Sequence, residues 1–156
     1  MAEIRFVEAQ PDDVEFIASN LRADDLEELR AAHGDDADPV RILHLSCRLS
    51  DRPVVAMTAA GEPLAVFGVV PVSMMDRDGR PWMMATDGAM RFRREIVRGG
   101  RYWTNLWSFR YARLHNHVDA RNVATIRWLR HIGYTIGEPV PYGTRGLPFC
   151  PFERCA

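Results

Sequence analysis

Lysine is absent from this sequence of 156 residues, and all 20 of its basic residues are arginines. Cysteine is scarce: three thiols cannot all pair within one chain, so we expect no disulfide framework. The longest nearly unbroken apolar run, Leu64 to Val72, is far shorter than the roughly 20 residues of a membrane-spanning helix. The first residues are acidic, which is not the pattern of an export signal. These absences argue against a disulfide-stabilised secreted protein and against a membrane protein, and we expect a protein that is cytosolic at synthesis.

The remaining composition is that of an ordinary globular protein, with 47% hydrophobic and 26% charged residues. A chain of this length is expected to fold as a single domain over residues 1–156 and to bury a sizeable core. We find no internal repeat, linker or low-complexity segment.

Charge is unevenly distributed, although the net charge is only −1. Residues 1–38 contain 12 acidic residues and 3 arginines, a net of −9, whereas residues 77–130 contain 12 arginines and 4 acidic residues, a net of +8. The second half should therefore attract a polyanion. Because each cation is a guanidinium, it can bind a phosphate through two parallel hydrogen bonds.

Hydrophobic periodicity, capping residues and turn signals predict both helices and strands. Helices are expected at residues 11–21, 24–33, 40–49, 91–110 and 122–131, and strands at residues 4–8, 54–57, 64–72, 82–86 and 113–118. Asp24 and Glu27 form an expected capping box at the second helix. Gly99 and Gly100 cost about 1 kcal/mol each in a helix and so favour two helical pieces there. The tail after Gly133 is rich in proline, and at most one or two short edge strands are expected in it.

This order of elements, with a three-stranded antiparallel meander in the middle, resembles that of the GNAT acyltransferases. One stretch sharpens the resemblance: Val118-Asp-Ala-Arg-Asn122, followed by Ile126, Leu129, Gly133 and Tyr134, looks like the late motif of that family. Its spacing of eleven residues from Asn122 to Gly133 is also that of the family. The resemblance implies an α/β (α+β) fold with a mixed, mostly antiparallel central sheet, flanked by helices and splayed between its fourth and fifth strands.

Over most of its length the chain further resembles a phage branch of this family, which includes the small internal virion protein of short-tailed phages. The matching stretches are Leu21–Leu29, Pro81–Gly88, Asn116–Asn122, Ile126–Leu129 and Gly133–Pro139. This resemblance implies a phage or prophage protein located in the host cytosol or in the virion, with other virion proteins as partners.

GNAT proteins bind acetyl-CoA or another acyl-CoA as co-substrate, with its pyrophosphate at the start of the helix that follows the fourth strand. A helix N-terminus suits this anion because it offers unpaired N–H donors and a positive partial charge. The resemblance assigns CoA binding to Gly88, Ala89, Arg91, Arg93, Arg94 and Asn122. The usual loop of the family, Q/R-x-x-G-x-G/A, is absent, and the three arginines also suit a solvated helix face, as Asn122 suits a helix cap.

Acyl transfer to an amine requires a base for the ammonium and an acid for the leaving thiolate. The resemblance implies Asp87 as the base, where it could equally cap the next helix. Many family members have a Tyr acid seven residues after the motif Asn. This chain has Leu129 there, so Tyr134 is our candidate acid, with Tyr102 and Tyr111 as alternatives.

The amine acceptor, a small molecule or a protein, is expected beside the first two helices, which border the acceptor site in this fold. Asp24, Glu27 and Glu28 are the candidate residues for contacting it. Capping and solvation explain these three acids equally well.

Two other interpretations start from different residues. His115 and His117 share a strand face and, with His131, Cys150 and Cys155, could bind a transition metal, but the spacings match no zinc module and no metal is expected. Arginines interleaved with Trp103, Trp107, Phe109 and Tyr111 could stack on single-stranded nucleic acid. Because those aromatics recur at helical spacing, we expect them to pack on the sheet, without a nucleic-acid partner.

The sequence thus leaves two functions from different classes. One is acetyl transfer from acetyl-CoA to an amine by direct attack. The other is a non-catalytic virion or assembly component that retains the fold, which the missing loop and the missing Tyr favour.

Overall fold

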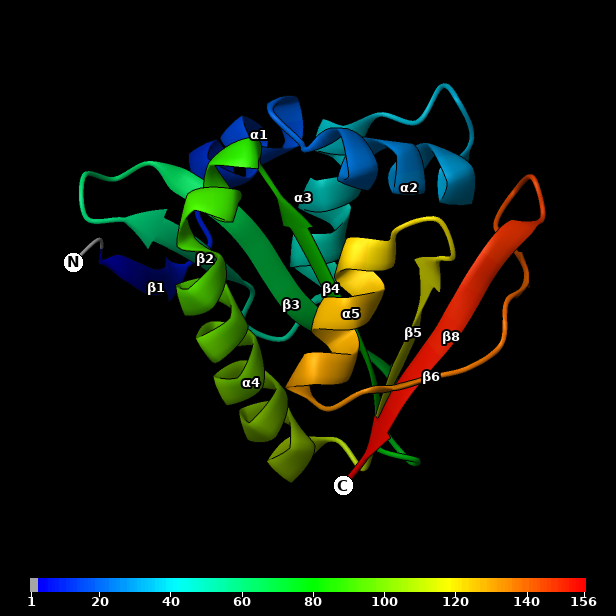
Figure 1. Cartoon of the computed structure of the whole chain (residues 1–156). Coiled ribbons are helices and arrows are strands. Elements are labelled where there is room, and N and C mark those ends of the chain that lie inside the picture. The colour runs from blue at the N-terminus through cyan, green and yellow to red at the C-terminus, as the bar shows by residue number, and fades with distance from the viewer. Residues whose placement is uncertain (1–2) are drawn as a thin grey trace.

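A mostly antiparallel sheet of eight strands runs through the protein, whose computed structural model describes residues 3–156 (Figure 1). The strand order is β1-β2-β3-β4-β5-β8-β6, and β7 also pairs with β8. Among the strands of residues 3–156, only β4 and β5 pair in parallel. The strands are β1 (Ile4–Glu8), β2 (Val54–Thr58), β3 (Pro63–Ser73), β4 (Asp78–Ala85), β5 (Arg113–Asp119), β6 (Thr135–Ile136), β7 (Val140–Tyr142) and β8 (Leu147–Cys155).

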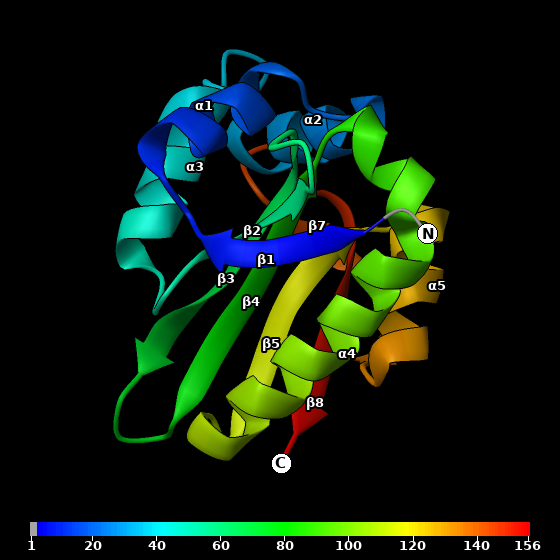
Figure 2. The same ribbon diagram turned by 90° about the vertical axis from the view of Figure 1, so that its left-hand side faces the viewer.

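Helices cover both faces of this sheet. They are α1 (Pro11–Ser19), α2 (Ala23–His33), α3 (Pro39–Leu49), the short 3-10 helix η1 (Asp87–Phe92), α4 (Arg93–Arg110) and α5 (Val123–Ile132). Figure 2 shows α1 and α3 on one side of the sheet and α4 and α5 on the other. The expected mixed sheet with flanking helices is confirmed. Within residues 3–156, no helix combines the length and the apolar character needed to cross a membrane.

Local chemistry explains where several helices begin and end. Pro11 begins α1, and the Asp38 carboxylate caps α3 by accepting the N–H of Val40 at 3.1 Å. The Asn122 side chain caps α5 by accepting the N–H of Thr125 at 3.3 Å. Gly133 ends α5 in the left-handed conformation, with φ at 112°. These helix limits agree with the sequence prediction.

Strand alternation creates a core on each face of the sheet. On β2, Val55 and Met57 pack with Val14 and Ile17 of α1, whereas Val54 and Ala56 belong to the cluster on the face of α4. A third cluster joins α5 to β5 and β8. The meander β2-β3-β4 and its two-sided burial therefore place β4 between two helical layers.

The expected break in α4 does not occur. The helix continues through Gly99 and Gly100 because each glycine lies against an aromatic ring: a Cβ on Gly99 would overlap Phe6, and one on Gly100 would lie 2.8 Å from Trp128. The two glycines therefore allow close packing of α4 on β1 and α5.

The C-terminal tail forms more sheet than we expected. β8 spans nine residues and pairs with β5 along seven of them, from Arg113 opposite Cys155 to Asp119 opposite Phe149. It is an inner strand, because β6 and β7 pair with it on its other side. Proline in the tail suggested edge strands, but the interrupted pairing of the short β6 and β7 accommodates these residues.

Candidate active site

The sheet opens between its two parallel strands. β4 and β5 pair only at Asp78 opposite Arg113 and Gly79 opposite Leu114. The side chain of Asn116 then donates a hydrogen bond to the carbonyl of Pro81 at 2.9 Å. Beyond this point the strands diverge, as Figure 1 shows. The expected splay between the fourth and fifth strands is therefore present.

Two carboxylates of α2 bind the separated strand ends. Asp25 accepts the N–H of Ala85 at the end of β4 at 2.8 Å, and Glu28 accepts the N–H of Asp119 at the end of β5, also at 2.8 Å. Asp25 in addition pairs with Arg22 at 2.8 Å. Helix α2 thus fixes the width of the gap at its open end.

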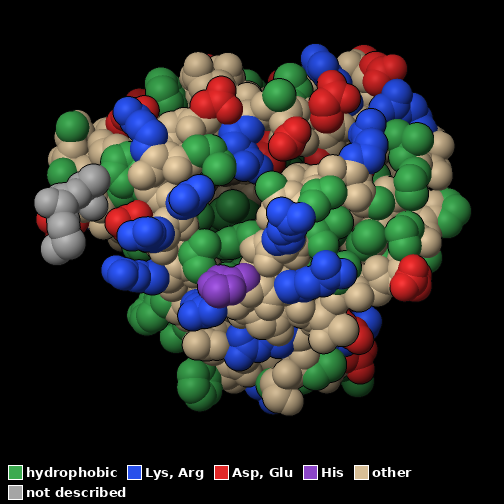
Figure 3. All heavy atoms as spheres, viewed as in Figure 1, with side chains coloured by type: hydrophobic (Ala, Val, Ile, Leu, Met, Phe, Trp, Pro, Cys, Tyr) green, Lys and Arg blue, Asp and Glu red, His purple; other side chains and the backbone are tan. Residues whose placement is uncertain are grey.

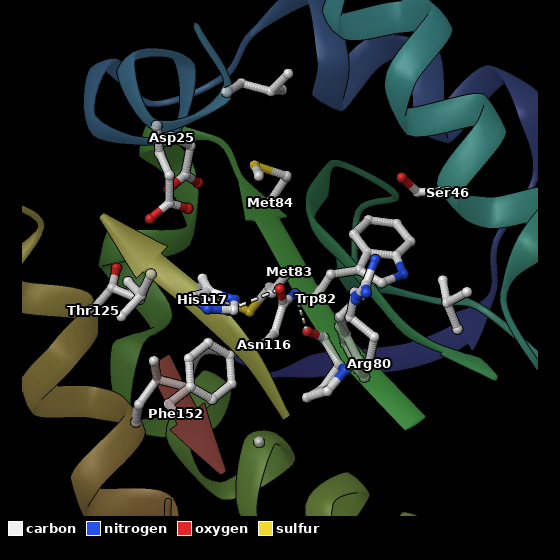
Figure 4. Close-up of a pocket in the computed structure, with 18 of the residues that line it drawn as sticks. Asp25, Ser46, Arg80, Trp82, Met83, Met84, Asn116, His117, Thr125 and Phe152 are labelled. Carbon is white, nitrogen blue, oxygen red and sulfur yellow. Dashed lines mark hydrogen bonds between the residues drawn. The ribbon is translucent and has the colours of Figure 1, made fainter. Parts of the chain in front are cut away.

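A cavity of about 450 Å³, here called the central cavity, passes through this gap (Figure 4). Its walls come from α2, α3, α4, α5 and the two diverging strands. Figure 4 shows Asp25 at one end, His117 and Asn116 of β5 near the middle, and Arg80 beside Trp82 of β4 at the other end. Glu28 and Tyr134 also line it.

A second cavity of about 540 Å³, here called the basic cavity, lies between the start of α4 and α5. Its basic side chains are those of five arginines and a histidine, namely Arg22, Arg93, Arg94, Arg98, Arg101 and His131. Figure 3 shows this hollow with hydrophobic side chains at its floor, arginines around it and a histidine at its rim. Both cavities share the lining residues Arg22, Met83, Ile96, Thr125 and Trp128. A ligand in one cavity therefore lies next to a ligand in the other.

The surroundings of Glu28 bring the pKa of its carboxyl group close to neutral. Burial raises its pKa to about 7, and the carboxylates of Asp25 and Asp119 act in the same direction. The hydrogen bond from the backbone of Asp119 and the charge of Arg22 oppose this shift without cancelling it. At pH 7 this carboxylate is divided between its proton-accepting and proton-donating forms.

Tyr134 lies on the α4 and α5 side of the central cavity. Its hydroxyl is 3.4 Å from that of Thr104 on α4, and its ring packs edge-on against Phe152. Burial raises the pKa of this phenol to about 12, so Tyr134 carries its proton at neutral pH. A phenol in this state can donate a proton but cannot act as a base.

Five of the residues that the sequence suggested for CoA binding lie around the start of α4, but they do not all line the same cavity. Ala89, Arg93 and Arg94 line the basic cavity. Arg91 instead pairs with Glu62 at 2.8 Å, and Gly88 lies beside that same carboxylate. The N–H of Ala89 donates to the carbonyl of Thr86 at 3.1 Å. The expected row of free N–H donors is therefore shortened, and the arginines supply most of the positive charge.

Asp87 and Asn122 line neither cavity. Asp87 is exposed at the start of η1, and Thr86 takes the N-cap position of η1 without a side-chain hydrogen bond. Asn122 is buried as the cap of α5, and within residues 3–156 no group accepts a hydrogen bond from its Nδ2. The capping interpretation of Asn122 is confirmed, whereas no cap hydrogen bond from Asp87 is present in this part of the chain.

Of the three acids that the sequence suggested for contacting the amine, only Glu28 lines the central cavity. Asp24 is exposed, and Glu27 is exposed and pairs with Arg30 at 3.5 Å. The expected capping box is wrong, because α2 begins at Ala23 and its N-cap, Arg22, has no side-chain cap hydrogen bond. The acid of α2 that binds the end of β4 is Asp25, because tertiary packing brings its carboxylate to the N–H of Ala85.

Sequence reasoning did not assign five charged residues of these cavities to the site, and it named His117 only as a possible metal ligand. The five are Arg22, Asp25, Arg80, Arg98 and Arg101. The arginine excess of residues 77–130 indicated the basic cavity in general, and the recurrence of Arg94, Arg98 and Arg101 at helical spacing was the signal that could have defined it. Nothing local in the sequence distinguishes Asp25 from Asp24.

The metal and nucleic-acid interpretations receive no structural basis. Within residues 3–156, no group of three or more His, Cys, Asp or Glu side chains is placed to hold a metal ion. Trp103 and Trp107 pack against Phe67 of the sheet, and Tyr111 is buried. Only Phe109 of the aromatic series is largely exposed.

The sequence matches no family model and no curated protein. The structure is similar to solved N-acetyltransferases at low identity. A GCN5-related N-acetyltransferase from Kribbella flavida has a TM-score of 0.69 and 16% identity, with 98% of both chains covered. Spermidine N-acetyltransferase from Vibrio cholerae, in complex with CoA and spermine, has a TM-score of 0.68 and 13% identity, over 97% of this chain and 95% of that one.

The protein AAC(6')-Ib, in complex with ribostamycin and coenzyme A, has a TM-score of 0.73 and 12% identity, over 98% of this chain and 93% of that one. The phage branch of the resemblance finds no support in these comparisons. Together with the splayed parallel pair, the similarities establish that this chain has the fold of the GCN5-related N-acetyltransferases.

Proposed function

We propose that the protein transfers an acyl group, such as acetyl, from acyl-CoA to an amine. The observation that carries this proposal is the contact between the two cavities at the gap between β4 and β5. One cavity has the arginine wall that a nucleotide diphosphate and a 3′-phosphate require. The other contains Glu28, whose pKa of about 7 suits removal of a proton from an ammonium group.

In the proposed binding mode, Arg93, Arg94, Arg98 and Arg101 hold the phosphates of the CoA portion in the basic cavity. The acyl-bearing arm extends past the shared wall of Met83, Ile96 and Trp128 into the gap. The amine approaches through the central cavity from the side of α2 and α3. This arrangement brings the two reacting groups together in a space with mostly apolar walls.

The proposed reaction has a balanced set of proton transfers. The ionised Glu28 carboxylate takes a proton from the ammonium group, and the resulting amine nitrogen attacks the thioester carbon. A C–N bond forms and the C–S bond breaks. Tyr134 donates its proton to the leaving sulfur. The resulting phenolate takes the second proton from the acylated nitrogen, and Glu28 releases the proton that it gained to solvent. We assign the base to Glu28 and not to Asp87, because Asp87 lies outside the central cavity.

Two measurements test this function. Acetyl-CoA at about 100 times its dissociation constant should add roughly 2.7 kcal/mol to the free energy of unfolding. Thiol release from acetyl-CoA should then accelerate when an amine is added. The absence of stabilisation by millimolar acetyl-CoA, together with the absence of thiol release, would contradict the proposal.

The non-catalytic alternative predicts that acetyl-CoA neither stabilises the protein nor releases its thiol. Its phage and virion context stands on the sequence resemblance alone. Glu28 instead supports the catalytic proposal. A carboxylate with a raised pKa lowers stability, and an amide side chain could occupy the same position between the strands without that cost.

A further inference from the structure

The half of the central cavity farthest from α2 has an unusual charge composition. The carboxylates that line the cavity are Asp25 and Glu28, and both lie at the α2 end. The far half is formed by Arg80 and Trp82 of β4, by Asn116 of β5 and by Leu45, Ser46 and Leu49 of α3, with His117 near the middle of the cavity. None of these far-half residues is an acid.

Arg80 is the cation of this half, and within residues 3–156 it has neither an ion-pair partner nor a side-chain hydrogen bond. Several other arginines of the same region do have partners. Arg22 pairs with Asp25, Arg110 with Asp51 at 2.6 Å, and Arg113 with Glu153 at 2.8 Å. Arg80 is exposed, so its two-pronged guanidinium is open to solvent and to a ligand at the edge of a substrate-sized cavity.

The side chains beside Arg80 in the cavity, His117 and Trp82, carry no negative charge that would offset it. Burial lowers the pKa of His117, and the charges of Arg80 and His115 lower it further, which favours the neutral form of this side chain. Its ring stacks on Tyr142 with the centroids 4.3 Å apart. Trp82 beside Arg80 already donates its indole N–H to Ser50 at 2.7 Å. The guanidinium of Arg80 is exposed and open to a ligand at the cavity edge.

We propose that the amine acceptor carries an anionic group, such as a carboxylate, that Arg80 binds while the amine lies at Glu28. This inference rests on the proposed function and specifies its substrate class. A polyamine such as spermidine fits poorly, because its second ammonium would lie near Arg80 with no acid to receive it. A bifunctional acceptor with opposite charges at its two ends satisfies both ends of the cavity.

The strand geometry also indicates how far apart the two charges are. Asn116, whose side chain contacts Pro81 next to Arg80, lies three residues before Asp119, which binds Glu28. At about 3.3 Å per residue this separation is roughly 10 Å along β5. The amine and the anion of the acceptor are therefore several bonds apart, as in an ω-amino acid or a peptide, and not attached to one carbon.

Matched acceptors test the inference directly. We would measure kcat and KM with acetyl-CoA for 6-aminohexanoate, hexylamine and 1,6-diaminohexane, which share a six-carbon chain and differ in the terminal group. The wild-type protein should prefer 6-aminohexanoate. Arg80→Gln should raise KM for 6-aminohexanoate about tenfold, the size of one lost charge-assisted hydrogen bond, with kcat within about twofold. Hexylamine should be unaffected, and Arg80→Glu should reverse the preference toward 1,6-diaminohexane.

The control is Arg48→Gln, which removes the same charge from an exposed position of α3 outside both cavities. Turnover that does not depend on Arg80, or a wild-type preference for hexylamine or 1,6-diaminohexane, overturns this inference and leaves the proposed function intact. Absence of turnover with all three amines and of stabilisation by acetyl-CoA overturns both.

Discussion

Asp25 and Glu28 lie one helical turn apart on α2, and their carboxylates accept N–H groups from two different strands, Asp25 from Ala85 of β4 and Glu28 from Asp119 of β5. One helix therefore binds both sides of the opening through which the proposed reaction takes place. The two acids differ in their surroundings: Asp25 has Arg22 as a partner, whereas burial and nearby carboxylates raise the pKa of Glu28. Their expected roles differ accordingly.

Asp25→Ala should destabilise the protein by about 2 to 4 kcal/mol, because it removes a buried charged acceptor and leaves both Arg22 and the Ala85 N–H without a partner. Urea denaturation measures the change. Asp24→Ala, one residue earlier on the exposed side of α2, should stay within about 0.5 kcal/mol of wild type. Equal effects of the two substitutions would show that Asp25 does not hold β4.

Glu28→Gln should lower kcat/KM for amine acetylation about a hundredfold or more, because it removes the general base. In the wild type, kcat/KM should rise with pH and level off above an apparent pKa of about 7, the value that burial gives Glu28. The variant should lose this ascending limb. Glu15→Gln on α1, an exposed position outside both cavities, is the control. An ascending limb that persists in Glu28→Gln would point to another base.

The same carboxylate should make stability depend on pH. The folded pKa of Glu28, about 7, is above its ordinary value of 4.5, so between these values the folded state retains a proton that the unfolded state has lost. The contribution of Glu28 to stability therefore falls as pH rises from about 4.5 to 7 and is constant above that range, with a total on the order of 3 kcal/mol. The difference in unfolding free energy between Glu28→Gln and wild type should grow over this window. A difference that does not vary with pH would contradict the raised pKa.

Replacing Arg93 and Arg94 together with Gln should weaken acetyl-CoA binding and reduce its dependence on salt, since both side chains line the basic cavity. Isothermal titration at two ionic strengths is the measurement. The matched control replaces Arg127 and Arg130, exposed on α5 and outside both cavities. The sequence predicts that Arg91→Gln weakens acetyl-CoA binding. The structure predicts no effect, because Arg91 pairs with Glu62 and does not line the basic cavity.

Gly99→Ala should destabilise the protein by about 1 to 3 kcal/mol, although alanine is the better helix former, because the added methyl overlaps the Phe6 ring. Thermal or urea denaturation gives the sign. In a Phe6→Ala background the ring is absent, and the same substitution should become neutral or stabilising. A stabilising effect in the wild-type background would mean that α4 does not pack closely on β1.

Local signals predicted those parts of the fold whose limits depend on neighbouring residues. The start of α1 at Pro11, the cap of α5 at Asn122 and its end at Gly133 are examples. The sequence was misleading wherever a tertiary contact replaced a local one. Asp25 rather than Asp24 binds a strand end, Gly99 faces a ring instead of breaking a helix, and β8 is an inner strand despite its prolines.

The candidate site was predicted in part for the same reason. The position of Arg93 and Arg94 follows from the order of the elements, and Glu28 from its place on α2. Arg80 was not identified, and His117 was considered only as a metal ligand, because their proximity depends on how β4 and β5 diverge. That divergence leaves no periodic pattern in either strand.

Trp128 and Met83 form part of the partition between the basic cavity and the central cavity. A change in either side chain alters the space available to both substrates, so the two Michaelis constants should shift together. Residues that line only one cavity, such as Arg80, should change only one of the two Michaelis constants. New acceptor preferences can therefore arise at such positions while the affinity for the acyl donor is preserved.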